Sequence, residues 1–190
     1  MATPSDFASI DSFVALNTLL TAAGVDTSRW GRENTKSVDD LWAEIAAGES
    51  RIRTQPLLRV VAGAVSVLIR RGSCMLIETR QVFASGMIRQ RNIPPAEKML
   101  PGERPIDAAI RCLSEELGVM RHDIESVASM SPPRHEVSPS PSYPGLLTSY
   151  TFHTVEARVQ GLPDHDFVTH EYDTDGQAWI IQHNWAWQRV

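Results

Sequence analysis

The sequence predicts a mixed α+β fold, on three observations. Apolar side chains recur at helical spacing within residues 1–50, and residues 57–79 are rich in Val and Leu, as buried strands are. A further helical pattern at residues 105–117 is followed by strand patterns at residues 123–130 and 146–159. With 190 residues, 42% of them hydrophobic and 22% charged, the chain suits one globular domain with an appendage. We expect a helical extension at residues 1–54 and the main domain at residues 55–190.

Two helices are expected in the extension. The first begins at a cap formed by Ser5 or Asp6 and ends before Gly24. The second spans residues 38–47 behind Ser37, which has the capping signature of an acidic residue three positions later. The extension is too short to bury much apolar surface alone. Its helices are therefore a candidate contact for a partner or a homodimer.

The main domain is expected to open with a β-hairpin and to contain one helix at residues 105–117, which begins with Pro105 and is followed by Gly118. The expected strands are residues 57–68, 74–79, 123–130, 146–159 and 177–181. Loops are expected at residues 131–145 and 161–175, and a short tail at residues 184–190. Residues 81–92 are polar and basic, and we expect a short strand there at most.

Charge is unevenly distributed along the chain. The net formal charge is −5, yet residues 51–134 hold 13 basic and 8 acidic residues, and 16 of the 18 basic residues are Arg. Arginine binds phosphate and carboxylate through a planar fork of N–H donors. A basic centre between acidic ends suits a compact anionic ligand better than a long nucleic acid, so no DNA partner is expected. Solvated surface arginines are the plain alternative.

The cellular context is inferred from what the sequence lacks. No apolar run reaches the roughly 18 residues of a membrane span, and residues 1–20 carry no Lys or Arg, unlike a signal peptide. Two cysteines, Cys74 and Cys112, are too few for a disulfide framework or a four-ligand zinc site. We expect a cytoplasmic protein without a membrane partner.

Residues 97–119 carry the most specific pattern in the chain, and they read EKMLPGERPIDAAIRCLSEELGV. This stretch resembles the Nudix box, G-x5-E-x7-R-E-U-x-E-E-x-G-U, in which U is aliphatic. The positions that match are Glu103, Arg111, Leu113, Glu115, Glu116, Gly118 and Val119. Glu97 stands in place of the opening Gly, and Cys112 stands in place of the Glu after the Arg. The resemblance implies a Nudix-like mixed β-sheet sandwiched by helices, with the N-terminal helical extension added.

The helix within this motif separates apolar residues from carboxylates. At roughly 100° per residue, the apolar side chains that share one arc are Ile106, Ala109, Ile110, Leu113 and Leu117. A second arc holds Arg111, Cys112, Glu115 and Glu116. Adjacent carboxylates repel each other, a cation relieves that cost, and hard oxygen ligands suit Mg²⁺ or Mn²⁺. A solvated acidic helix face is the alternative.

The resemblance implies a hydrolase that uses Mg²⁺ (or Mn²⁺) to cleave an organic diphosphate carrying a nucleoside, a sugar or a prenyl group. The implied metal ligands are Glu115, Glu116, Glu103 and Glu97. The candidate catalytic residues, which would orient or deprotonate water, are Glu116, Glu115 and Glu171 from the last long loop. Arg111 is expected to pair with Glu103 and brace the loop against the helix, and Gly118 is a structural residue of the box.

Three residues outside the box are candidate contacts of the small-molecule diphosphate substrate. Arg89 and Arg91 lie just before the box and could clamp phosphate oxygens, or could be ordinary surface charges. Tyr143 lies in the long loop, where it could stack on a base, cover an apolar ligand or pack.

Cys112 stands where the resemblance puts a metal-ligating glutamate. A thiol is a poor ligand for Mg²⁺, and Glu97 could compensate in part. The alternative function is therefore a non-hydrolytic Nudix-like domain that binds a ligand, RNA or a protein partner, or that catalyses a non-hydrolytic reaction. Cys112 could itself act as an acid or nucleophile, although nearby carboxylates would raise the pKa of its thiol. Isopentenyl diphosphate isomerases also resemble this helix, but no Cys–His motif precedes the box.

Overall fold

A computed structural model of the chain describes residues 7–32, 35–170 and 180–190. Its helices are α1 (Phe13–Ala22), α2 (Val38–Ala46), α3 (Pro105–Glu115) and the 3₁₀ turn η2 (Arg121–Asp123). Its strands are β1 (Ser50–Thr54), β2 (Leu57–Val61), β3 (Ala64–Arg71), β4 (Cys74–Phe83), β5 (Ile88–Ile93), β6 (Ala96–Lys98), β7 (Ile124–Ser129), β8 (Arg134–Pro139), β9 (Leu147–Val159), β10 (Phe167–Thr169) and β11 (Ile180–Arg189). The predicted mixed α+β class is confirmed. Among the described residues, every helix is too short or too polar to cross a lipid bilayer.

The described residues form two compact units. The first unit is drawn from residues 1–63, 99–102 and 134–152, and the second from residues 64–98, 103–133 and 153–190. Each unit therefore combines segments that are far apart in the sequence. The predicted division between residues 54 and 55 stays a prediction.

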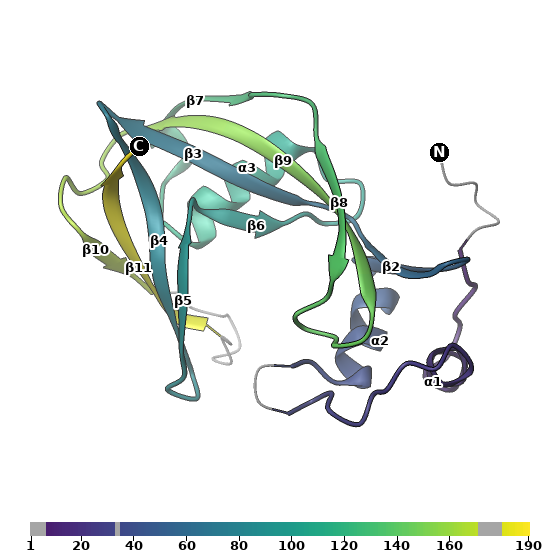
Figure 1. The fold of residues 1–190 in the computed structure, drawn as a ribbon. Coiled ribbons are helices and arrows are strands. Elements are labelled where there is room, and N and C mark those ends of the chain that lie inside the picture. The colour runs from purple at the N-terminus through teal and green to yellow at the C-terminus, as the bar shows by residue number, and fades with distance from the viewer. Residues whose placement is uncertain (1–6, 33–34, 171–179) are drawn as a thin grey trace. The chain divides into compact units, whose positions relative to one another are not determined.

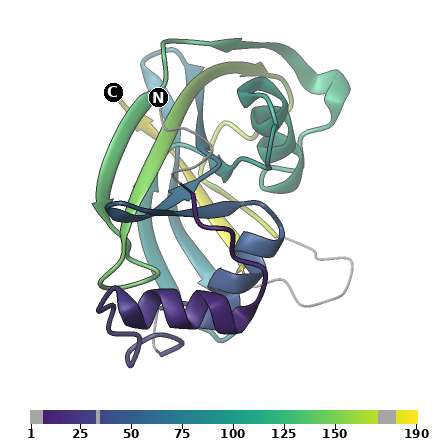
Figure 2. The ribbon, with the colours of Figure 1, turned by 90° about the vertical axis from the view of Figure 1, so that its right-hand side faces the viewer.

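In the first unit, α1 begins later than predicted (Figure 2). The hydroxyl of Ser12 caps the helix by accepting a hydrogen bond of 3.2 Å from the Ala15 N–H. The preceding segment is extended, because the Ala8 N–H donates to the Ile52 carbonyl at 2.8 Å and Phe7 forms a β-bridge with Arg53. The expected start at Ser5 or Asp6 is wrong for this reason, since a helix cannot include a segment that pairs as a strand.

The second predicted helix is present as α2, and its capping signature is complete. The Ser37 hydroxyl accepts from the Asp40 N–H, and the Asp40 carboxylate accepts from the Ser37 N–H at 2.7 Å. Both helices contribute to one apolar core, whose buried members are Leu16, Leu20, Trp30, Leu41, Ile52, Tyr143 and Leu146.

The strands of the first unit pair in the order β1, β2, β9 and β8. β1 and β2 form an antiparallel hairpin, β2 runs parallel to β9, and β8 runs antiparallel to β9. The interpretation of residues 131–145 as a loop is therefore wrong in part, because β8 lies inside it. Only Pro139 of its prolines lies within β8, at the last position of a strand for which the structure gives β9 as partner, and proline is tolerated on such edge strands.

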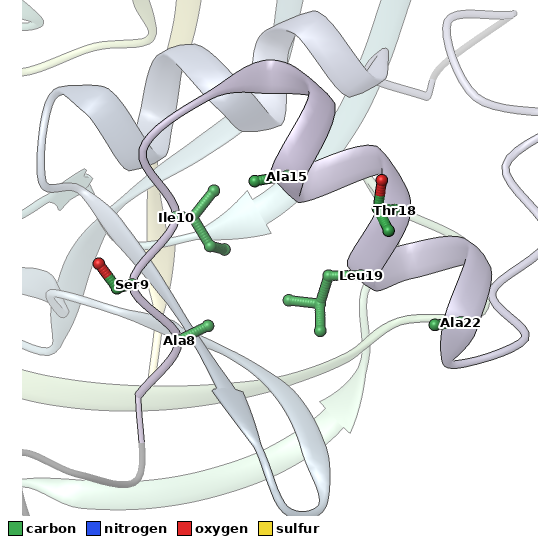
Figure 3. Close-up of a pocket in the computed structure, with 7 residues that line it drawn as sticks. All are labelled: Ala8, Ser9, Ile10, Ala15, Thr18, Leu19 and Ala22. Carbon is green, nitrogen blue, oxygen red and sulfur yellow. The ribbon is translucent and has the colours of Figure 1, made fainter.

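A shallow pocket lies on the first unit between α1 and the extended segment before it (Figure 3). Its lining is apolar or uncharged and consists of Ala8, Ser9, Ile10, Ala15, Thr18, Leu19 and Ala22. A pocket without a cationic side chain is not suited to a diphosphate. The expected homodimer contact through the N-terminal helices stays a prediction.

The second unit is organised around β4, which has β11 along one edge (Figure 1). The other edge pairs with β3 near the hairpin turn and with β5 further along the strand. β10 adds to β11, β6 pairs with β3, and α3 packs on β3, β6 and β7. Two expectations are corrected here. Residues 81–92 contribute to two strands, the end of β4 and most of β5. Residues 184–189 of the supposed tail belong to β11, whose backbone is paired with β4.

Candidate functional site

The helix that carries the motif is α3, and its ends follow from local sequence. Pro105 occupies the first turn, where its missing N–H leaves no bond unmade. Arg104 precedes it and makes a two-point ion pair with Asp107, with contacts of 2.6 and 2.8 Å. Gly118 has a φ of +68°, a left-handed conformation that suits glycine and turns the chain away from the helix. The carboxylates near the end of α3 thereby keep fixed positions.

Arg111 gathers three carboxylates at the start of the site. Its Nε and Nη2 donate to the two carboxylate oxygens of Glu103, both at 3.1 Å, and Nη2 also donates to the Lys98 carbonyl at 2.7 Å. Its Nη1 lies 3.1 Å from Glu115 and 3.5 Å from Glu97. Burial would lower the pKa of Arg111, but the carboxylates outweigh it and hold the pKa above its usual value. This guanidinium connects the loop before α3, the strand β6 and the helix itself.

The carboxylates expected to lie together on α3 differ in their exposure. Glu115 is 53% exposed at its side chain and pairs with Arg111 one turn earlier. Glu116 is only 9% exposed, and none of the described residues forms a hydrogen bond with its buried Oε2. Cys112 was expected on the carboxylate face, yet it is fully buried one turn before Glu116. The residues of the carboxylate arc therefore split between solvent and the interior.

Burial raises the pKa of Glu116 to about 8. The charge of His183 opposes that rise, whereas the nearby carboxylates Glu78 and Glu97 add to it. Burial likewise raises the pKa of the Cys112 thiol well above its usual value, and the carboxylates of Glu116 and Glu97 raise it further. A thiol so strongly held in its protonated form is a poor nucleophile, so the geometry does not favour a nucleophilic Cys112.

A buried ionic array lies near Glu116 on three adjacent strands. His183 on β11 places Nδ1 2.6 Å from Oε1 of Glu78 on β4, and the exposed fractions of these residues are 1% and 0%. The other oxygen of Glu78 accepts from Nε of Arg91 on β5 at 2.8 Å. Burial would raise the pKa of Glu78, but the bond to His183 and the charge of Arg91 outweigh it and lower that pKa. Glu78 is therefore a carboxylate at neutral pH.

The end of α3 is tied to the same group of strands. The Thr169 hydroxyl on β10 donates to the carbonyl oxygen of Glu116 at 2.5 Å and accepts from the indole N–H of Trp185 at 2.7 Å. Thr169 is paired with His183 in the β10–β11 register, and the rings of His183 and Trp185 stack with their centroids 5.7 Å apart. These contacts set the position of Glu116 relative to β11.

Glu78 and His183 are the site residues that the sequence analysis missed. One signal was present, because Glu78 directly follows the apolar run Met75, Leu76 and Ile77. An acidic residue within such a run is rarely buried unless it is paired. No comparable local signal singles out His183.

The other predicted residues have different surroundings. Arg91 is committed to Glu78, and Arg89 donates to the side-chain oxygen of Gln81. Tyr143 is fully buried in the core of the first unit, where its ring lies against Trp30 at 5.1 Å between centroids. A ring without exposed surface cannot stack on a ligand, so its expected role in substrate binding is not supported, and Tyr143 packs. Glu171 lies outside the described residues.

The fit of a divalent cation depends on which carboxylate oxygens lack a partner. Within the described ranges, no three His, Cys, Asp or Glu side chains lie close enough to share a metal ion. The buried Oε2 of Glu116 is nevertheless an acceptor that needs a donor or a cation. Mg²⁺ commonly uses one or two protein carboxylates and completes its shell with substrate phosphates and water. Glu116, with Glu97 near it, fits an ion that is bound together with a diphosphate.

One comparison with known proteins shows the family of the chain. The family model described as the NUDIX domain matches residues 57–185. No curated protein matches the chain. Similar solved structures include a NUDIX hydrolase from Nitrosomonas europaea, with 19% identity, a TM-score of 0.42 and coverage of 66% of this chain and 71% of that one.

Two further solved structures are similar at comparable levels. The Nudix hydrolase RenU from M. smegmatis has 16% identity and a TM-score of 0.34, and the match covers 66% of this chain and 70% of that one. The Ap4A hydrolase from C. elegans has 17% identity and a TM-score of 0.35, with coverage of 68% and 80% respectively.

Proposed function

Because the chain belongs to the Nudix family, we propose that it is a hydrolase of organic diphosphates that works with Mg²⁺ or Mn²⁺. The substrate is a diphosphate linked to a nucleoside, a sugar or a prenyl group. The observation that carries this proposal is the carboxyl of Glu116, which is 9% exposed and has a buried oxygen without a hydrogen-bond partner among the residues that the structure describes. Such an atom is costly in a folded protein unless a ligand completes it.

Glu116 and Glu97 would hold the ion, and Glu115 is a further ligand that would first have to leave Arg111. When bound, a divalent cation neutralises the charge of a diphosphate and lowers the pKa of a coordinated water. Glu103 contributes indirectly, because both of its oxygens are engaged by Arg111 in the two-point contact. We assign Arg111 and Gly118 to support of the site, since one ties the loop to α3 and the other ends the helix.

The chain's own proton acceptor is Glu116. Its pKa of about 8 means that the carboxyl is largely protonated at neutral pH in the free protein, so a bound cation must displace that proton. Once ionised, Glu116 can orient or deprotonate water near the diphosphate. Glu171 remains a second candidate for this role from the sequence.

A second candidate function is binding of a diphosphate ligand, RNA or a protein without hydrolysis. Two observations favour it. Cys112 replaces a ligand that the Nudix box supplies, and Arg111 pairs with three of the carboxylates that a metal would need. Guanidinium pairing lowers the negative charge available to a cation. Where the bound ligand is a diphosphate, the two candidates share a ligand class and differ in turnover.

The test is release of phosphate or pyrophosphate from a panel of diphosphates. The panel contains nucleotide sugars, dinucleoside polyphosphates, nucleoside triphosphates and prenyl diphosphates, each with Mg²⁺ and with Mn²⁺. The matched control is Asp107→Asn, which removes an exposed carboxylate from the same helix. We expect turnover that is lost in Glu116→Gln and kept in Asp107→Asn. Turnover that Glu116→Gln leaves unchanged would refute the assigned metal site, and no turnover across the panel would favour binding without hydrolysis.

A further inference from the structure

Two arginines on β5 differ in what neutralises them. Arg91 gives its Nε–H to Glu78, a carboxylate with no exposed surface, at 2.8 Å. Arg89, two residues earlier, gives its Nε–H to the side-chain oxygen of Gln81 at 2.9 Å, and its Nη2 donates to the same oxygen. An amide oxygen is neutral, so this contact orients Arg89 without cancelling its charge.

The guanidinium of Arg89 is held on two sides. Gln81 is directly opposite Arg89 in the β4–β5 register and is only 2% exposed, so it is a fixed acceptor. The guanidinium carbon also lies 5.2 Å from the centroid of the buried Phe83 ring. A cation over an aromatic face is attracted by the ring electrons. The side chain of Arg89 is therefore oriented before any ligand arrives.

The charge balance around Arg89 favours an anion. Partial burial and the charge of Arg91 lower the pKa of Arg89, and the charge of Glu78 only partly offsets them. Among the described residues, no carboxylate forms an ion pair with Arg89. Two of the guanidinium's five N–H donors face Gln81, which leaves the edge formed by Nη1 and Nη2 for another acceptor.

We propose that Arg89 is the phosphate-binding residue of this site, positioned by Gln81 and Phe83, and that Arg91 is a structural partner of Glu78. The edge of a guanidinium matches two oxygens of one phosphate group and binds them together. The ligand class is thus the phosphate end of a diphosphate. This inference rests on the proposed function for its substrate, but binding of an anion does not require turnover.

The experiment is calorimetric titration of the full chain with inorganic pyrophosphate, first in EDTA and then with Mg²⁺. Loss of a hydrogen-bonded charge is worth roughly 1.5–3 kcal/mol, so Arg89→Gln should weaken pyrophosphate binding by about 10- to 100-fold. Gln81→Glu keeps Arg89 but gives it its own carboxylate, and it should weaken binding by about tenfold. Arg80→Gln removes an exposed cation from the neighbouring strand and should leave affinity within about twofold.

Lysine substitutions separate Arg89 from Arg91. Arg89→Lys keeps the charge but loses the planar fork, and it should weaken binding by about tenfold. Arg91→Lys keeps a cation beside Glu78 and should change affinity by no more than about twofold. Thermal melting of each variant checks that it is folded before it is titrated.

Three results would overturn the inference: no pyrophosphate binding to the wild-type chain at millimolar concentration, normal binding by Arg89→Gln, or equal losses in Arg91→Lys and Arg89→Lys. The hydrolase proposal fails on a different measurement. A chain without turnover can still bind pyrophosphate through Arg89, and an active chain whose Arg89→Gln variant binds pyrophosphate normally refutes this inference alone.

Discussion

Replacement of Glu116 by Gln should stabilise the metal-free protein, by an amount that grows with pH. The carboxyl of Glu116 has a pKa of about 8 in the folded chain and an ordinary value near 4.5 when it is solvated. Below pH 4.5 the group is protonated in both states and imposes no penalty. As the pH rises towards 8, the unfolded chain ionises while the folded chain holds its proton, so the free energy of unfolding falls.

The magnitude follows from the two pKa values. At about 1.36 kcal/mol for each pH unit between them, the loss reaches at most about 5 kcal/mol at pH 8. An amide does not titrate, so Glu116→Gln escapes this loss. The stability difference between the variant and the wild type should be small near pH 5 and several kcal/mol near pH 8.

The assay is urea unfolding in EDTA at pH 5, 6, 7 and 8, followed by tryptophan fluorescence. Asp107→Asn serves as the control, because the bond to Arg104 lowers the pKa of Asp107 and keeps it ionised throughout this range. The control should follow the wild type at every pH. A stability difference between Glu116→Gln and the wild type that does not change with pH would refute the reasoning.

Three further predictions concern other residues. Cys112→Glu should tighten Mg²⁺ binding and raise turnover, because it adds a hard oxygen ligand. Calorimetry measures the Mg²⁺ affinity and the diphosphate panel measures turnover. No gain in either quantity would mean that position 112 does not face the ion. Arg111→Lys should lower the free energy of unfolding by about 1–3 kcal/mol, because it loses the two-point contact with Glu103; an unchanged urea midpoint would contradict this. Glu44→Ala should lower the free energy of unfolding by about 3–5 kcal/mol, because the buried Arg59, whose guanidinium lies 2.5 Å from the Glu44 carboxylate, would lose that ion pair. A free energy of unfolding equal to that of the wild type at pH 7 would contradict this prediction.

Helix α3 was predictable because its local signals agree. Pro105, the apolar arc and Gly118 all point to the same boundaries, and the structure places the helix at Pro105–Glu115. The resemblance to the Nudix box also implied a contact between Glu103 and Arg111, and this contact forms. Interactions of this kind join residues within a few turns, so a sequence pattern contains them.

Elements that depend on distant partners were harder to predict. Ser5, Asp6 and Ser12 can all cap a helix, and the choice of Ser12 follows from pairing of the preceding segment with Ile52 and Arg53. Most of β11 was missed, because the expected strand ended at Ile181 and the strand β4, which pairs with β11, lies about a hundred residues earlier. Tertiary pairing, more than local preference, decides such segments.

The buried part of the site escaped prediction for the same reason. Glu78 and His183 are separated by 105 residues, and only the pairing of β4 with β11 brings them to 2.6 Å. The split between the exposed Glu115 and the buried Glu116 also depends on what α3 packs against. A helical wheel identifies neighbours on one helix but does not show which of them reaches solvent.

The measurement that tests the central claim most directly is a Mg²⁺ titration of diphosphate hydrolysis by the wild type, Glu116→Gln and Asp107→Asn. The substrate is whichever member of the panel the wild type cleaves fastest. We predict saturable, Mg²⁺-dependent turnover in the wild type and in Asp107→Asn, and none above background in Glu116→Gln. Turnover by Glu116→Gln with the wild-type Mg²⁺ dependence, or a wild type that cleaves no diphosphate at any Mg²⁺ concentration, would contradict the account.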